Sequence, residues 1–126
     1  MKFLLKKYFL LTFVFFLRID CTVTQDGFRP RFLREILREH KWLGRKLKLD
    51  FQIMYTNCPK PYEIFWKVRN VGEVAKQRNM IRGEVICTNN PHQIERTSFY
   101  GPHYVECFLV KNKVCIARDR IDVPIE

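Results

Sequence analysis

The stretch of sequence that decides the fold is Pro61-Tyr-Glu-Ile-Phe-Trp-Lys-Val-Arg-Asn-Val-Gly72. Its side chains fall into two alternating sets, Tyr62, Ile64, Trp66 and Val68 on one side and Glu63, Phe65, Lys67 and Arg69 on the other. A period of two is typical of a β-strand with one buried face, so Trp66 is expected in a core between two sheets. Asn70 and Gly72 tolerate positive φ, which predicts that the strand ends there in a turn.

Further strands are predicted on both sides of this stretch. Lys46–Met54 alternates cleanly, with Leu47, Leu49, Phe51 and Ile53 facing inward. In Thr97-Ser-Phe-Tyr-Gly-Pro-His-Tyr-Val-Glu-Cys107 a Tyr-Gly-Pro turn precedes a strand over 103–110. The other predicted strands are 80–88, 95–99, 114–120 and 121–125, with a tight hairpin at Lys111-Asn112-Lys113 in which Asn112 accepts left-handed geometry. Short strands at this spacing predict a mainly β protein, an Ig-like antiparallel β-sandwich.

One N-terminal amphipathic helix of about three turns is predicted over Phe28–His40. Pro30 suits its first turn. Its apolar stripe consists of Phe32, Leu33, Ile36 and Leu37. Two roles fit such a stripe: docking on the chain's own sheet, or contact with a separate partner.

Residues 1–21 form a basic and apolar head, in which Met1-Lys-Phe-Leu-Leu-Lys-Lys precedes the apolar run Tyr8–Leu17. The run has the length of a signal-peptide core and is short for a bilayer span. Arg18-Ile-Asp-Cys21 fits neither a signal cleavage site nor a lipobox. Three interpretations therefore stay open: a secretory signal, a membrane-surface anchor in which only residues 1–18 touch the membrane, or a non-native start. Residues 22–27 are predicted to be a linker, and 28–126 a single β-sandwich domain.

Charge and cysteine content narrow the class of protein. Most of the net charge of +10 belongs to residues 1–60 rather than to the predicted β-rich part, which argues against sequence-specific nucleic-acid binding. Five cysteines without a CxxC pair match neither a zinc site nor an even disulfide framework. We interpret Cys87, Cys107 and Cys115 as reduced core residues of a cytoplasmic protein; a Cys87–Cys107 disulfide in an oxidising compartment is the alternative.

Several of these motifs, in this order, resemble the adenylyl/guanylyl and SMODS C-terminal sensor domain. The resemblance covers about residues 27–126 and rests on Pro61-Tyr62…Trp66-Lys-Val-Arg-Asn-x-Gly72, Arg82-Gly83, Ser98-x-Tyr-Gly-x-His-x-Val-Glu-Cys107 and Val114-Cys-x-Ala117. That module is usually the last domain of bacterial nucleotidyltransferases that make cyclic oligonucleotides in antiphage defence. The resemblance implies an Ig-like accessory domain that senses a signal and tunes a synthase, here a separately encoded one.

The sequence departs from a complete synthase. Nucleotidyl transfer needs a Gly-Ser turn for the triphosphate and an Asp-x-Asp pair for two metal ions. The sequence has no Gly-Ser dipeptide. Its nearest approach to an Asp-x-Asp pair, Asp119-Arg-Ile-Asp122, has the wrong spacing. His103 and Glu106 would lie on opposite faces of a strand, and Ser98 lacks a nucleophile elbow. No catalytic residue, metal site or cofactor is therefore predicted.

The candidate ligand-binding residues are Arg69, Asn70, Arg82, Tyr100 and His103. They lie next to glycines in predicted loops or strand ends, where a backbone can approach a ligand closely. Two guanidinium groups, an aromatic face and an imidazole would suit a nucleotide-like or other anionic ligand. The alternative is that Arg69 and Arg82 only pair with Glu84 or Glu106 at the surface.

The predicted function is that of a non-catalytic sensor or regulatory domain. The alternative is a secreted or surface-attached Ig-like binding module, for which the head at residues 1–17 is the only argument.

Overall fold

The computed structural model describes residues 10–25, 29–39, 47–70, 85–96 and 101–125. Its elements are β1 (Leu10–Leu11), β2 (Leu17–Thr24), β3 (Arg31–Phe32), α2 (Leu33–Arg38), β4 (Lys48–Thr56), β5 (Glu63–Asn70), β6 (Val85–Cys87), β7 (His92–Arg96), β8 (Gly101–Lys111) and β9 (Val114–Ile125). The described chain is therefore mainly β, as predicted.

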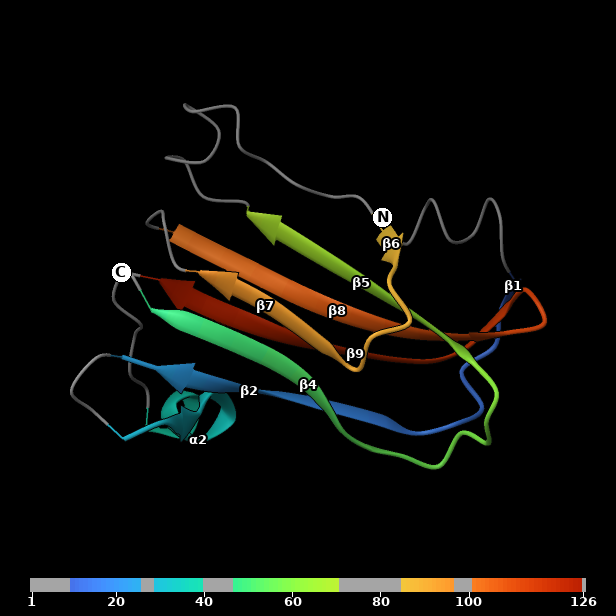
Figure 1. Ribbon diagram of the computed structural model, residues 1–126, viewed down its shortest axis with the longest axis horizontal. Helices are drawn as coiled ribbons and strands as arrows, with labels where there is room; N and C mark the ends of the chain where they lie inside the picture. The colour runs from blue at the N-terminus through green and yellow to red at the C-terminus, as the bar shows by residue number, and fades with distance from the viewer. Residues whose placement is uncertain (1–9, 26–28, 40–46, 71–84, 97–100, 126) are drawn as a thin grey trace.

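The strands form two sheets (Figure 1). One has the order β1-β9-β8-β5-β6 and the other β3-β2-β4-β7. Among the described strands, every pairing is antiparallel except that of β1 with β9, which is parallel. The prediction of an immunoglobulin-like arrangement is finer than this topology establishes, and it stays a prediction.

A large core lies between the sheets because strands such as β4 and β5 turn alternate side chains inward. Leu49 and Phe51 on β4 and Ile64, Trp66 and Val68 on β5 are all buried, as their period of two predicts. The buried indole of Trp66 donates from Nε1 to the Asn90 carbonyl oxygen at 2.8 Å. That bond satisfies the one polar atom that the tryptophan brings into the core.

The predicted hairpin is confirmed at the junction of β8 and β9. Lys111 pairs with Val114, and the two residues between them have φ of 51° (Asn112) and 63° (Lys113). Positive φ at both central positions matches a type I′ turn, whose twist suits flanking strands. The two segments predicted after the turn form one continuous strand, β9.

The prediction of a three-turn N-terminal helix over 28–40 is wrong in extent and place. The helix α2 has six residues and follows three strands, because Phe32 and Arg31 instead pair with Thr22 and Val23 of β2. Leu33 and Ile36 are buried in the shared core, so this part of the apolar stripe docks on the chain's own sheets. Phe32 remains 41% exposed.

The structure also differs from the expected division into a head (1–21) and a linker (22–27). Residues 17–24 form β2, an interior strand between β3 and β4. Its inward side chains Leu17, Ile19, Cys21 and Val23 are all buried in the core. Among the described residues, no helix is long and apolar enough to cross a membrane.

The cysteine prediction is confirmed for Cys107 and Cys115, which are fully buried, and wrong for Cys87, which is exposed on β6. All five cysteines are free thiols, which contradicts a Cys87–Cys107 disulfide. Cys87 stands opposite Phe65 in the β5–β6 register, and Cys107 opposite Trp66 in the β5–β8 register. Neighbouring positions of β5 face opposite ways, so the two thiols lie on opposite faces of the sheet.

Candidate functional site

Strands β5 and β8 bring three of the predicted ligand-binding positions to one end of the five-stranded sheet. In the backbone register Asn70 stands opposite His103, and Arg69 stands opposite Tyr104. Residues that are far apart in the sequence thus meet at one end of the two strands. Arg82 and Tyr100 fall outside the described residues, so their convergence on this end stays a prediction.

Alternation along the strands separates Arg69 from His103. His103 is 9% exposed and lies on the inner face, where it lines a hollow with Val68, Val105 and Val123. Arg69 directly follows Val68, so its side chain leaves the strand toward the outer face. One small ligand can contact both side chains only if it lies across the end of the strands.

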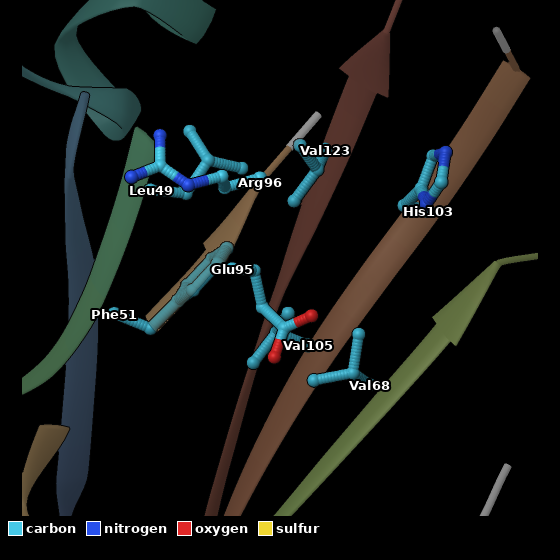
Figure 2. A pocket seen from close by; sticks show the side chains of 8 residues that line it. All are labelled: Leu49, Phe51, Val68, Glu95, Arg96, His103, Val105 and Val123. Atoms are coloured by element: carbon cyan, nitrogen blue, oxygen red, sulfur yellow. The ribbon is translucent and has the colours of Figure 1, made fainter. Parts of the chain in front are cut away.

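The hollow on the inner face lies between the two sheets (Figure 2). Its lining from the other sheet is Leu49 and Phe51 on β4 and Glu95 and Arg96 on β7. Figure 2 shows the Glu95 carboxylate reaching from β7 toward Val68 and Val105 on the opposite sheet. Gln93 Nε2 donates to Glu95 Oε2 at 2.7 Å, which helps to hold this carboxylate in place.

The size of the hollow limits what it can hold. Its volume is about 20 Å³, room for roughly one water molecule. A nucleotide needs far more, since small-molecule sites span about 300–1,000 Å³. A ligand at this end of the sheet must therefore bind outside the hollow or widen it by separating β7 from β8.

Arg69 is the predicted residue with the clearest unmet bonding capacity. Its Nε is buried and has no hydrogen-bond partner within the described part of the chain. Glu106, offered above as a surface partner, is instead paired with Arg118, whose Nε donates to Glu106 Oε2 at 2.6 Å. The alternative that Arg69 merely pairs with Glu106 is therefore wrong.

Arg69 belongs to a cationic and aromatic outer face built around Tyr104. Lys67 Nζ donates to the Tyr104 hydroxyl at 2.5 Å, and the Arg120 guanidinium carbon lies 3.9 Å from the Tyr104 ring centroid. Arg120 is held in turn by Asp122, with Nη2 and Oδ1 2.9 Å apart. Lys67 is only 2% exposed, although it lies on the face of β5 opposite Trp66.

Two buried thiols of the five-stranded sheet are poor nucleophiles. Burial raises the pKa of the Cys107 thiol, and the Asp119 carboxylate raises it further. Burial likewise raises the pKa of Cys115 to about 11. Both thiols are therefore neutral at pH 7, as expected of cysteines that act as small core hydrophobes. Within the described ranges no three His, Cys, Asp or Glu residues are grouped so as to hold a metal ion.

Sequence reasoning missed two sets of polar residues. Glu95 was placed at the start of a predicted strand, and its inward direction follows only from the pairing of β7 with β4. Arg18, Arg34 and Arg38 together line an open groove, although Arg18 was assigned to the head. The usable signal was the alternation of Leu17-Arg-Ile-Asp-Cys-Thr-Val-Thr24, which the preceding apolar run obscured.

The fold defines a small, mainly β domain built from two sheets. The chain belongs to the adenylyl/guanylyl and SMODS C-terminal sensor domain family, whose model matches residues 2–126. This confirms the resemblance and extends it over the head and the predicted linker. The family consists of sensor domains associated with nucleotidyltransferases, accessory rather than catalytic. A search of curated proteins finds no match.

Proposed function

We propose that this chain is a non-catalytic sensor domain that binds a small anionic, nucleotide-like ligand and tunes a nucleotidyltransferase. The match of residues 2–126 to a family of sensor domains is the observation that carries the proposal. The ligand would sit across the ends of β5 and β8, against Arg69, Asn70 and His103, with Arg82 and Tyr100 completing the site. The domain would act in the cytoplasm, in antiviral defence that uses cyclic oligonucleotides.

Two observations support a ligand at the ends of these strands. The buried Nε of Arg69 offers a donor that no described residue uses. An anion would supply the acceptor, and a charge-assisted hydrogen bond is about twice as strong as a neutral one. Around Tyr104, Lys67 and Arg120 add positive charge to the same outer face.

A ligand screen tests the proposed site. Thermal unfolding of the full chain is measured with nucleotides, cyclic dinucleotides and phosphorylated metabolites, and repeated on Arg69→Ala and Arg82→Ala. We expect one ligand class to raise the melting temperature of the wild type, and both variants to bind it about 10- to 100-fold more weakly, the scale of a lost charge-assisted bond. Lys48→Ala, an exposed cation on β4, is the control that should leave binding unchanged.

A ligand that stabilises the wild type and both arginine variants equally would show that the site lies elsewhere. No shift with any compound would point to a macromolecular stimulus, and would overturn the small-ligand part of the proposal.

The non-catalytic part of the proposal has its own test. Incubation with nucleoside triphosphates and Mg²⁺ or Mn²⁺ should yield no linear or cyclic oligonucleotide. Product formation would contradict it. Addition of the chain to a nucleotidyltransferase from the same genome should change the rate of that enzyme, and the change should depend on the ligand found in the screen.

The secreted or surface-attached alternative meets a structural obstacle. Removal of residues 1–21 would take Leu17, Ile19 and Cys21 out of the core and leave only the last residues of β2. Cell fractionation with an antibody to the C-terminal part decides between the two: intact protein in the cytoplasm supports the sensor, and processed protein outside it supports the alternative.

A further inference from the structure

An open groove lies between α2 and β2, and its described lining shares no residue with the strand-end site at Arg69 and His103. Its volume is about 340 Å³, and its described lining is Arg18, Arg34, Leu37 and Arg38. Three of these four side chains carry a guanidinium group, and Leu37 is half-buried. Figure 1 shows α2 alongside β2. Arg34 and Arg38 of this six-residue helix line the groove together with Arg18 of β2.

Arg34 is fixed in place at the base of the groove. Its Nε donates to the Ile19 carbonyl oxygen at 2.9 Å, and its Nη2 donates to Asp119 Oδ2 at 3.0 Å. The backbone N–H of Arg34 donates to Asp20 Oδ1 at 3.1 Å. Such preorganisation lowers the entropy that a ligand contact would otherwise cost.

Arg18 and Arg38 are different, because both are exposed and neither forms an ion pair within the described residues. The helix acids are engaged elsewhere: Glu35 and Glu39 both accept from Arg31, at 2.6 and 2.7 Å. Arg34 and Arg38 are one helical turn apart, a like-charge spacing that destabilises a free helix. The arginines of the groove thus stay close together, although Glu35 and Glu39 lie next to them in the sequence.

Two acidic groups moderate the charge of the groove. Asp20 accepts from the backbone of Cys21 and Arg34, and Asp119 accepts from Arg34 and from the Ile19 N–H. Both carboxylates thus already accept bonds from groups that build the groove. Within the part of the chain that the structure describes, the positive charges of Arg18 and Arg38 have no such partner, which leaves them for a ligand.

We propose that this groove binds a small oligophosphate, either free or as the phosphate part of a nucleotide. The planar guanidinium fork pairs with phosphate oxygens through two parallel bonds, so two arginines that line one groove favour a ligand with two phosphoryl groups. A single carboxylate carries one negative charge, too little for both Arg18 and Arg38, while Arg34 already pairs with Asp119. The volume lies within the range of small-molecule sites, while the predominance of charged lining disfavours an apolar ligand. The groove is distinct from the strand-end site proposed above and does not depend on it.

Calorimetric titration of the full chain with inorganic pyrophosphate tests the proposal. The double variant Arg18→Gln/Arg38→Gln should bind about tenfold or more weakly than the wild type. The matched control Lys48→Gln/Lys113→Gln removes two other exposed cations and should change the affinity less than twofold. Arg69→Ala should also bind normally, which separates this groove from the strand-end site. Equal weakening in both double variants, or no binding by the wild type at millimolar pyrophosphate, would overturn the proposal.

A second measurement uses only the wild type and so does not depend on the variants folding. Arginine side-chain Nε–H resonances are followed by NMR during the pyrophosphate titration, and the shifts should concentrate on Arg18, Arg34 and Arg38. Shifts confined to other arginines would contradict the groove as the site. A parallel titration with ADP distinguishes the two sources: tighter binding than pyrophosphate assigns a nucleotide, and equal binding assigns the oligophosphate alone.

Discussion

Arg34 on α2 forms an ion pair with Asp119 on β9, with Nη2 and Oδ2 3.0 Å apart. The pair joins the helix, which packs beside β2 and β3 of the four-stranded sheet, to the five-stranded sheet. The same carboxylate oxygen accepts the backbone N–H of Ile19 on β2 at 2.8 Å. One aspartate thus holds three elements together at the edge of the core. Both side chains are partly exposed, 22% and 25%, so the charge attraction itself is screened.

Replacement of Asp119 by alanine should therefore act mainly through the stranded Ile19 N–H. We expect Asp119→Ala to lower the free energy of unfolding by about 1–3 kcal/mol, the cost of a buried donor without an acceptor. Asp119→Asn keeps an acceptor oxygen and should cost less. Urea denaturation measures both, with Asp122→Ala, 73% exposed, as a control near zero. Equal losses for Ala and Asn would contradict this account.

The β8–β9 turn offers a stabilising change. Lys113 has φ of 63°, a region that costs a residue with a Cβ about 1–2 kcal/mol. Lys113→Gly should raise the free energy of unfolding by about 0.5–1 kcal/mol, since the added freedom of the unfolded chain offsets part of the gain. Asn112→Gly should change it less, because asparagine tolerates this region. Thermal unfolding of the two variants checks the order, and a loss of stability in Lys113→Gly would refute it.

The Arg118–Glu106 pair should show the penalty of a stranded buried charge. Glu106 is 2% exposed, while Arg118 is 21% exposed. Breaking a fully buried pair costs about 3–5 kcal/mol, so Arg118→Met should approach the lower end of that range. The double variant Arg118→Met/Glu106→Gln should recover part of the loss. If the double variant is as unstable as the sum of the singles, the two side chains act independently.

The raised thiol pKa values predict that stability falls at alkaline pH. Burial raises the pKa of Cys115 from 9.0 to about 11, so the folded state keeps its proton when the unfolded chain loses it. The unfolded state then binds fewer protons, and the free energy of unfolding falls as pH rises from about 9 to 11, by at most about 1.4 kcal/mol per pH unit.

Urea denaturation in reductant, at pH steps from 7 to 11, measures this slope. The wild type should lose stability with pH more steeply than Cys115→Ala, while the two curves run parallel below pH 8. Parallel curves over the whole range would show that Cys115 ionises equally in both states. Cys21, whose thiol pKa burial also raises, should behave in the same way.

The strands β4 and β5 were predictable because each carries its own period of two, independent of its neighbours. The β8–β9 turn was predictable from Asn112 for the same local reason. Strand β2 was not found, since its alternating half follows directly on the continuous apolar run that ends at Leu17. A single window across both reads as a signal-like segment.

Non-local pairing explains the other differences. Arg31 and Phe32 fit a helical pattern, but pairing with β2 holds them in extended geometry. The arginine groove brings Arg18 together with Arg34 and Arg38, which follow it by 16 and 20 positions. No local sequence pattern predicts that these side chains line one groove. At the strand-end site, the register of β5 and β8 brought Asn70 and His103 opposite each other, whereas alternation sent Arg69 to the other face.

The hydrogen bond from Ile19 to Asp119 spans 100 residues, and the parallel pair Leu10–Val114 spans a similar distance. During synthesis, the early strands emerge from the ribosome long before β9 exists to receive them. The chain loses conformational entropy in closing so long a loop before the long-range contacts can stabilise it. This slows folding and leaves the edges of the early strands exposed until β9 pairs. This domain can therefore complete its folding only after β9 has been synthesised. Any domain joined to it on the same polypeptide would meet it in a partly folded state until then.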